Sequence, residues 1–432
     1  MNNKLITFSK TALDTAMVYL TLCSLEIRTY RHNKLATNEK QVLVLASALP
    51  PHVTGGSYRP MSWAKYASSN NWRITFLTKD LNTPLQNSKA GEHLANQMKG
   101  QSEIFRVKKP RLNPSWKLLP KVDGSFLDAL ATISLGLKLF NNNKPSVIVA
   151  TGPSFDYFIA AYYLSKILGI PLVLDYRDEW TENPFPFVNK GKTDEYWEKR
   201  IFKFAKSIIF TTESMKQHHI KKYNRSDKIH VVTNGWESSE HSPHTSIEKT
   251  DETVLTFVGN IASHNLPFDF INDINKCYQH INNGLKLKFV GHIPEPIKIK
   301  MLELDINDII EFENFLPRNE ANLQMQSCSA LLLFNPPELA RYLPGKVFDY
   351  LSAGRPIIVH GNEGETAKLI RKLTAGYFVD TGSTETLVKI LNQLPLLSQH
   401  ENITNSKDLL RFSRETLATQ FYGILDQVAD ED

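Results

Sequence analysis

The chain contains 432 residues, 41% of them hydrophobic and 22% charged, and its formal net charge is +5. This length is too great for one ordinary hydrophobic core and predicts two domains of a soluble globular protein. The mild positive charge permits an anionic substrate or a membrane surface, and the sequence has no RNA-binding motif and no long basic tract that would indicate nucleic acid. The three cysteines are far apart, which argues against a disulfide framework or a zinc site and favours a reducing compartment.

Residues 1–40 form an N-terminal extension whose role the sequence leaves open. Its segment 12–23 is mostly apolar, but it contains Asp14 and is shorter than the ~20 residues that a membrane-spanning helix needs. No cleavage site follows it, so a signal peptide is not expected. Four basic residues come next: Arg28, Arg31, His32 and Lys34. We favour a helix packed on the protein surface or on a neighbouring subunit, and an amphipathic helix at a membrane interface is the alternative.

Strand-like apolar runs alternate with helix-like stretches along the rest of the chain, which predicts an α/β fold with parallel sheets. The predicted strands of the first half are 42–46, 73–77, 146–150, 172–175, 207–210 and 230–232. Helices are expected around 62–69 and at 157–168. The polar stretch 237–252 is typical of a linker. The predicted strands of the second half are 254–258, 285–290, 309–312, 330–334 and 357–359, and the chain after Pro395 is expected to be helical.

This alternation predicts two doubly wound, Rossmann-like domains, at residues 41–236 and 253–398, followed by a helical segment at 399–432. Ligands of such sheets bind beyond the carboxyl ends of the strands. We therefore expect the site in a cleft between the two domains.

The most informative segment is 336–356, between two apolar runs that are predicted to be parallel strands. It holds a loop and a short helix whose first turn carries Gly345 and Lys346. Backbone N–H groups and a cation at a helix N-terminus suit a phosphate. The alternative is that Gly345 and Gly354 only mark the two ends of the helix and that the Lys346 side chain is exposed to solvent.

This segment resembles the donor-binding segment of glycosyltransferase family 4, which has the GT-B fold. Members of this type often read P-G/S-K-hydrophobic-F-E/D-Y-L-A/S-A-G-R/K-P. Five residues of this chain are in register with that pattern: Lys346, Asp349, Tyr350, Gly354 and Pro356. The resemblance implies two domains facing each other, a nucleotide-sugar donor in the C-terminal one, and a last helix that crosses back onto the N-terminal one.

Loops of the first half carry further parts of the resemblance. The loop 50–59 contains Gly55, Gly56 and Arg59, and in the family this loop contacts the donor diphosphate. It lacks the G-x-G-x-x-G of a dinucleotide site, which counts against a nicotinamide enzyme. The alternative for Arg59 is a surface position on the following helix.

Two further loops of the first half are expected on the acceptor side. They contribute Thr151, Gly152, Asp175 and Trp180. Between Asp175 and Trp180 stand Arg177 and Asp178, which we predict to be catalytic together with Lys346, with Asp178 as a general base for the acceptor hydroxyl. The alternative is an ion pair of Arg177 with Asp178 or Asp175 that organises the loop.

In the second half, loops that follow predicted strands resemble the donor site of the family. The predicted donor-binding residues of this half are Gly259, Asn260, Gly291, Pro317, Arg341, Gly345, Lys346, Val347 and Asp349. The chain departs from the family at the first acid of its two-glutamate motif, where it has Arg341. No base follows Gly259 closely, so Arg341, Lys346 and Arg59 are the candidates for the diphosphate charge.

The sequence thus predicts a glycosyltransferase that moves a sugar from a nucleoside diphosphate, most simply a UDP-sugar, to a glycan or lipid-linked glycan. No cofactor is expected, and no metal either, because no Asp-x-Asp pair stands in a loop suited to a metal–diphosphate bridge and residues 305–308 are typical of a turn. The resemblance implies retention of anomeric configuration, a role in surface polysaccharide synthesis and a cytoplasmic location, with a peripheral membrane contact left open. The alternatives are a non-catalytic scaffold subunit of the same fold and a sugar-nucleotide epimerase.

Overall fold

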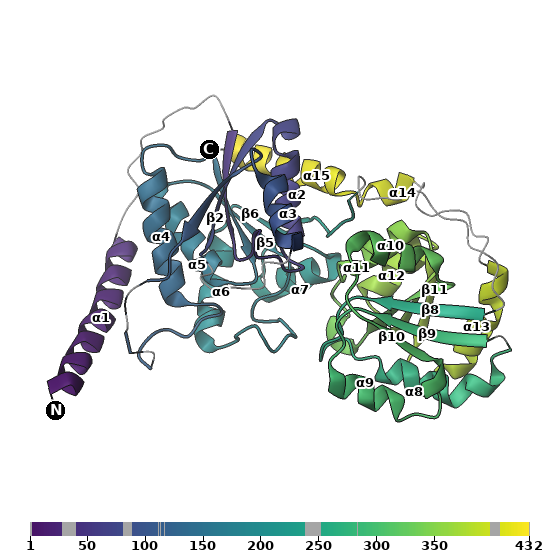
Figure 1. Ribbon diagram of the computed structural model, residues 1–432. Coiled ribbons are helices and arrows are strands. Elements are labelled where there is room, and N and C mark those ends of the chain that lie inside the picture. Colours follow the sequence, from purple (N-terminus) through teal and green to yellow (C-terminus); the bar gives the residue numbers. More distant parts are fainter. Residues whose placement is uncertain are drawn as a thin grey trace. The chain divides into compact units, whose positions relative to one another are not determined.

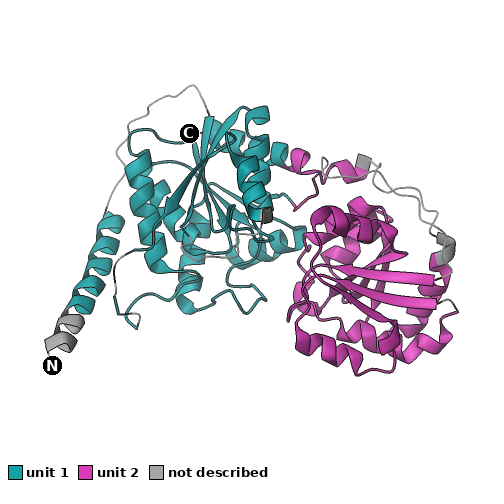
Figure 2. Ribbon diagram, in the orientation of Figure 1, with its two compact units in different colours: residues 1–232, 418–432 teal, residues 233–417 magenta. Residues whose placement is uncertain are grey.

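The computed structural model describes residues 2–27, 40–80, 89–110, 112, 114–115, 117–237, 252–282, 284–397 and 407–431. The chain divides into two compact units, which Figure 2 shows in different colours. Unit 1 comprises residues 1–232 and 418–432, and unit 2 comprises residues 233–417. The division falls just before the predicted linker, most of which lies outside the described residues.

Unit 1 is built on a seven-stranded parallel sheet with the order β3-β2-β1-β4-β5-β6-β7 (Figure 1). Its strands are β1 Lys40–Ala46, β2 Trp72–Lys79, β3 Glu103–Val107, β4 Val147–Gly152, β5 Leu172–Tyr176, β6 Ser207–Phe210 and β7 Ile229–Val231. The central strands β4 and β5 are buried along their whole length, as expected for a parallel sheet covered on both faces. The six strands predicted from apolar runs are all present.

The helices of unit 1 cover this sheet. Their bounds are α2 Tyr58–Tyr66, α3 Lys89–Met98, α4 Phe126–Phe140, α5 Asp156–Leu168, α6 Lys192–Phe204 and α7 Glu213–Tyr223. The helix α5 was predicted within one residue, whereas α2 begins and ends earlier than expected. The sequence analysis missed β3, because only its last residue is buried and its sequence has no continuous apolar run. It also missed α3, α4 and α6.

Unit 2 contains a six-stranded parallel sheet with the order β10-β9-β8-β11-β12-β13. Its strands are β8 Glu252–Val258, β9 Gly284–Val290, β10 Ile310–Glu313, β11 Ala330–Asn335, β12 Ile357–Gly361 and β13 Gly376–Asp380. Its helices are α8 Phe268–Cys277, α9 Glu295–Leu302, α10 Arg318–Ser327, α11 Lys346–Ala353, α12 Glu365–Lys372, α13 Thr384–Leu397 and α14 Lys407–Leu410. The edge strand β13 was not predicted. The turn expected at 305–308 is present as a short 3-10 turn, Asn307–Ile309, before β10.

The last helix, α15 (Arg414–Asp430), returns to unit 1. The ring of Phe421 stacks on Trp63 of α2 with centroids 4.1 Å apart, and the Tyr422 hydroxyl donates to the Trp63 carbonyl oxygen at 2.8 Å. Lys40 at the start of β1 forms an ion pair with Asp426 at 2.8 Å. The return of the C-terminal helix onto the N-terminal domain is therefore confirmed.

The N-terminal extension contains one long helix, α1 (Asn2–Ile27). Val18 and Leu25 on its inner face are buried, and Glu26 accepts a hydrogen bond from Tyr163 of α5 at 2.7 Å. The favoured interpretation, a helix packed on the protein surface, is confirmed for the described part of α1. Within the described residues, no helix is long and apolar enough to cross a membrane.

Candidate functional site

Each sheet has one topological switch point, where the order in which successive strands are added reverses. Several of the predicted site residues lie in loops near these points. In unit 2 the central strand β8 lies between β9 and β11, so the loops after β8 and β11 leave toward opposite sides. In unit 1 the strand β1 lies between β2 and β4 in the same way. Ligands of open α/β sheets bind beyond the carboxyl ends of strands at such switch points.

The helix α11 follows β11 and is fixed directly onto β8. The Tyr350 hydroxyl accepts a hydrogen bond from Val258 N at 2.7 Å and donates to Val258 O at 3.1 Å. Residues four apart lie on the same face of a helix, so Lys346 also faces the end of β8. The Lys346 Nζ atom lies 3.8 Å from the ring centroid of Phe257.

The Lys346 ammonium group is buried and has no hydrogen-bond acceptor among the described residues. Burial disfavours its charged form and lowers its pKa to about 7, although the negative charge of Asp349 acts in the opposite direction. The Phe257 ring offers its negative face, which stabilises a cation only in part. A buried cation without an anion is costly, so this position is suited to an anionic ligand. The alternative of a solvated Lys346 is wrong.

Gly259 lies beside this lysine, and Gly291 packs against Gly259. Gly259 and Gly291 adopt φ values of +133° and +129°, which side chains rarely tolerate. A Cβ atom on Gly259 would lie 2.8 Å from Lys346 Nζ, and one on Gly291 would lie 2.4 Å from Gly259 O. The two loops therefore pack closely, and Gly259 places backbone without a side chain next to the Lys346 ammonium.

The other predicted donor residues of unit 2 have mixed environments. The Asn260 side chain accepts from His292 N at 3.3 Å and so joins the loops after β8 and β9. Val347 is fully buried in the core, and its N–H donates to Pro344 O at 3.0 Å. Pro317 is exposed immediately before α10, Gly345 precedes α11, and Arg341 is partly exposed in the segment between.

Asp349 lies one turn after Lys346 and pairs with Arg318 at the start of α10, at 3.1 Å. Burial raises the pKa of the Asp349 carboxyl, and Arg318 counteracts this shift. The sequence analysis did not select Arg318, Phe257 or His264 as site residues. Burial and the Lys346 charge both lower the pKa of His264, which places this ring within the electrostatic reach of the ammonium.

At the switch point of unit 1, Arg59 forms a buried ion pair with Asp175. Its Nη2 atom lies 2.7 Å from Asp175 Oδ1, and both side chains are buried. The Thr151 hydroxyl donates to the other oxygen of Asp175 at 2.7 Å. The alternative of a surface position for Arg59 is wrong. Asp175 and Thr151 are at most 1% exposed, so these side chains stabilise the loops and are not accessible to a ligand.

Arg177 ties three segments of this edge together through carbonyl oxygens. Its guanidinium donates to Gly152 O at 3.0 Å, to Pro153 O at 2.8 Å and to Gly56 O. The sequence offered an ion pair with a neighbouring acid as one alternative. Arg177 does organise the loop, but its hydrogen bonds go to the backbone of the loops that contain Gly56 and Gly152.

Asp178 differs from the other acids of this edge, because it has no hydrogen bond or ion pair with any described residue. Burial raises its pKa to about 6, although the Arg177 charge lowers it. A carboxylate with this pKa can exchange a proton near neutral pH. Trp180, two residues later, is fully buried, stacks on Phe155 and donates to Asp194 at 3.0 Å, so its side chain belongs to the core.

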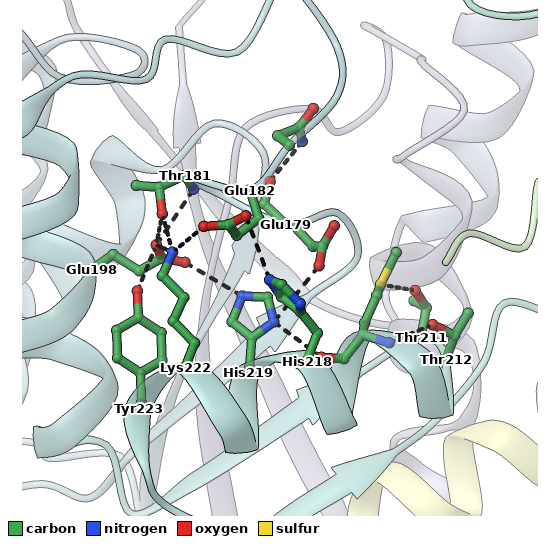
Figure 3. Close-up of polar contacts among 12 residues, drawn as sticks. Glu179, Thr181, Glu182, Glu198, Thr211, Thr212, His218, His219, Lys222 and Tyr223 are labelled. Carbon is green, nitrogen blue, oxygen red and sulfur yellow. Dashed lines mark hydrogen bonds and ion pairs between the residues drawn. The ribbon is translucent and has the colours of Figure 1, made fainter. Parts of the chain in front are cut away.

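A buried polar cluster lies behind this loop, and no motif in the sequence indicated it (Figure 3). The ring of His219 on α7 lies between Glu179 and Glu198, with each nearest nitrogen–oxygen distance 3.7 Å. All three side chains are fully buried. Burial acts to raise the pKa of Glu198, but His219, Lys222 and Thr181 outweigh it and lower the pKa to about 2.

The same cluster binds Thr181 and Glu182, which follow Asp178 in the loop. Thr181 and Tyr223 donate to Glu198, the latter at 2.8 Å, and Lys222 binds Glu182 at 2.7 Å. Figure 3 shows these side chains converging from the loop, α6 and α7. The cluster therefore anchors the segment that carries Asp178. Within the part of the chain that the structure describes, no group of three His, Cys, Asp or Glu side chains is arranged to hold a metal ion.

Comparisons with known proteins agree with this architecture. Residues 55–240 match the model of Glycosyltransferase Family 4. No curated protein matches the chain. Among solved structures, a glycosyltransferase from Rickettsia africae superposes with a TM-score of 0.67 at 12% identity, covering 92% of this chain and 100% of that one. The lipopolysaccharide outer core galactosyltransferase WaaB has a TM-score of 0.64 at 13% identity, covering 90% and 99%.

A third structure, Anabaena HepE in complex with UDP and glucose, has a TM-score of 0.65 at 14% identity and covers 90% of this chain and 100% of that one. Identities this low establish the fold alone. The chain thus has the GT-B fold of these structures, and its residues 55–240 match the model of Glycosyltransferase Family 4.

Proposed function

We propose that this enzyme binds the diphosphate of a UDP-sugar at Lys346 and transfers the sugar, without a metal ion, to a hydroxyl group of a glycan or lipid-linked glycan. The observation that carries the proposal is the buried Lys346 ammonium, which has no acceptor among the described residues. Its position beside Gly259, at the start of a helix and at the switch point of the sheet, suits a phosphate.

The chemical task is to stabilise the diphosphate as it leaves the anomeric carbon. A fixed cation and oriented N–H groups provide this stabilisation without reorganisation, and a water-poor site increases their effect. Lys346 supplies the cation, and the backbone around Gly259 and Gly291 leaves room for the phosphates. Retention of configuration is the outcome that the family resemblance implies.

On the acceptor side we assign the proton transfer to Asp178. It has no partner among the described residues, and its pKa of about 6 leaves it mostly ionised at neutral pH. Arg177 acts as a positioning residue, because it joins the loops that contain Gly56 and Gly152 to the strand end that carries Asp178. The choice of UDP draws support from HepE, whose structure contains UDP.

The test is thermal unfolding of the purified enzyme against a panel of nucleoside diphosphates and their sugars. A ligand that binds only the native state raises the unfolding midpoint by mass action. We expect a shift with UDP or a UDP-sugar that persists in EDTA, is lost in Lys346→Met and is kept in the control Lys372→Met, an exposed lysine of unit 2. No shift with any nucleotide would contradict the proposal and favour a scaffold role.

A further inference from the structure

The outward face of α1 has no partner among the described residues, and it is apolar. Four large side chains on this face follow one another at spacings of three, four or seven residues, which places them on one side of a helix. Leu13 is 62% exposed, Met17 47%, Leu20 69% and Ile27 77%. The smaller residues around them are Ala12, Ala16, Cys23 and Ser24, and all four are exposed. From Leu13 to Ile27 this face carries no charge, and the exposed Lys10 stands one turn before Leu13.

The two acids of α1 point elsewhere. Asp14 is buried with the inner face, and Glu26 pairs with Arg200 at 2.6 Å and with Lys166 at 3.1 Å on unit 1. Figure 1 shows α1 at the margin of unit 1. A surface helix of a soluble domain normally presents polar residues to water. The apolar outward face therefore requires an explanation beyond packing on unit 1.

A basic segment borders this face. Ser115 N donates to the Thr15 hydroxyl at 2.9 Å, and the Tyr19 hydroxyl donates to Leu118 O, so the segment around 115–118 lies along α1. Leu118 is 60% exposed and extends the apolar surface. Between Glu103 and Asp123 the sequence has no acid. It has six basic residues there: Arg106, Lys108, Lys109, Arg111, Lys117 and Lys121.

Four of these bases, Lys108, Lys109, Lys117 and Lys121, are exposed, and none forms an ion pair with a described residue. An apolar stripe with a cationic border complements an anionic lipid surface, in which acyl chains accept the apolar side chains and headgroups attract the lysines. A second copy of this chain would bring the same lysines together, and like charges oppose such a contact. The charge pattern thus favours a bilayer over a dimer.

We propose that the outward face of α1, together with the lysines of the segment 108–121, binds the surface of an anionic membrane with α1 lying in the plane of the interface. No helix in the described part of the chain is able to span the bilayer. The apolar side chains enter the boundary between headgroups and acyl chains, and the lysines add attraction that salt weakens.

Cys23 gives a direct probe, because it is exposed on this face while Cys277 and Cys328 are buried. An environment-sensitive fluorophore on Cys23 should shift to shorter wavelength with vesicles that contain phosphatidylglycerol, and much less with pure phosphatidylcholine. The control carries Cys23→Ser and Glu303→Cys, which moves the label to an exposed position of unit 2, and it should not respond. The assay needs no donor or acceptor, so it is independent of the proposed function.

Vesicle flotation of variants then separates the contributions. Leu20→Glu should weaken binding at least tenfold, and Lys117→Glu with Lys121→Glu should weaken it and reduce its salt dependence. The matched pair Lys372→Glu and Lys389→Glu on unit 2 should have no effect. The proposal is overturned if wild-type protein does not float with anionic vesicles, if it binds neutral vesicles equally well, or if it is a dimer that Leu20→Glu dissociates.

Discussion

Basic side chains at the carboxyl edges of the two sheets differ in whether the protein itself supplies their hydrogen-bond acceptors. In unit 1 Arg59 is paired with Asp175 at 2.7 Å, and Arg177 donates to three carbonyl oxygens. In unit 2 Lys346 is buried without an acceptor among the described residues, and its pKa falls to about 7. A buried cation that has acceptors within the protein stabilises the fold, whereas a buried cation that has none is available to bind an anionic ligand.

The largest expected effect comes from breaking the satisfied pair. Arg59→Met leaves the Asp175 carboxylate buried beside Thr151, and this should lower the free energy of unfolding of unit 1 by about 3–5 kcal/mol. Urea denaturation, followed by the fluorescence of the buried tryptophans, measures the change.

Arg59→Met combined with Asp175→Leu is the matched control for this prediction. The double variant removes both charges, so it should recover most of the lost stability. If Arg59→Met alone is as stable as the wild type, the arginine is not satisfied by Asp175 and the contrast between the units fails.

The next effect concerns the unsatisfied cation. Lys346→Met should weaken UDP binding about 100-fold, because a charge-assisted contact to phosphate is lost. The same change should leave the unfolding free energy equal or raise it by ~1–2 kcal/mol, since a buried charge is replaced by an apolar side chain. Calorimetric titration and denaturation of the same sample give both values. A loss of stability together with the loss of binding would indicate a structural role for Lys346.

A smaller effect is expected from acid. The folded-state pKa of Glu198 is about 2, against an ordinary value of 4.5. Its contribution to stability is therefore fully present above pH 4.5 and is lost as the pH falls toward 2. Glu198→Gln should reduce stability at neutral pH and flatten this part of the acid dependence. An unchanged acid profile in Glu198→Gln would show that other carboxyls control it.

The smallest effect is the pH profile of kcat/KM for the donor. Activity should rise as Asp178 ionises near pH 6 and fall as free Lys346 loses its proton near pH 7, which gives a narrow bell. The residual activity of Asp178→Asn should lack the acid limb, and that of Lys346→Met should lack the alkaline limb. If both variants keep both limbs, neither residue controls the reaction.

The sequence predicted much of this arrangement where local pattern determines it. The short helix that carries Lys346 in its first turn was predicted, and the apolar runs on either side of it identified the neighbouring strands. The fold class, the two sheets and the return of α15 are all confirmed. The edge strands β3 and β13 escaped prediction, because their exposed residues interrupt the apolar pattern.

Pairing across long separations was not predictable in the same way. Arg59 and Asp175 are 116 positions apart, and the sequence gives no means of deciding that one neutralises the other. The cluster of Glu179, Glu198 and His219 joins a loop and two helices, so it exists only once the fold brings them together. Whether a charged residue is satisfied, which separates scaffold from ligand site here, is therefore a property of the tertiary structure.

The most direct test of the account is proton uptake when UDP binds. Calorimetric titrations near pH 8 in buffers of different ionisation enthalpy count the protons that the complex takes up. With a free pKa of about 7, Lys346 should take up ~0.9 proton as the diphosphate restores its charge, and Lys346→Met should take up none. UDP binding without proton uptake, or with the same uptake in Lys346→Met, would contradict the assignment of this lysine as the phosphate-binding cation.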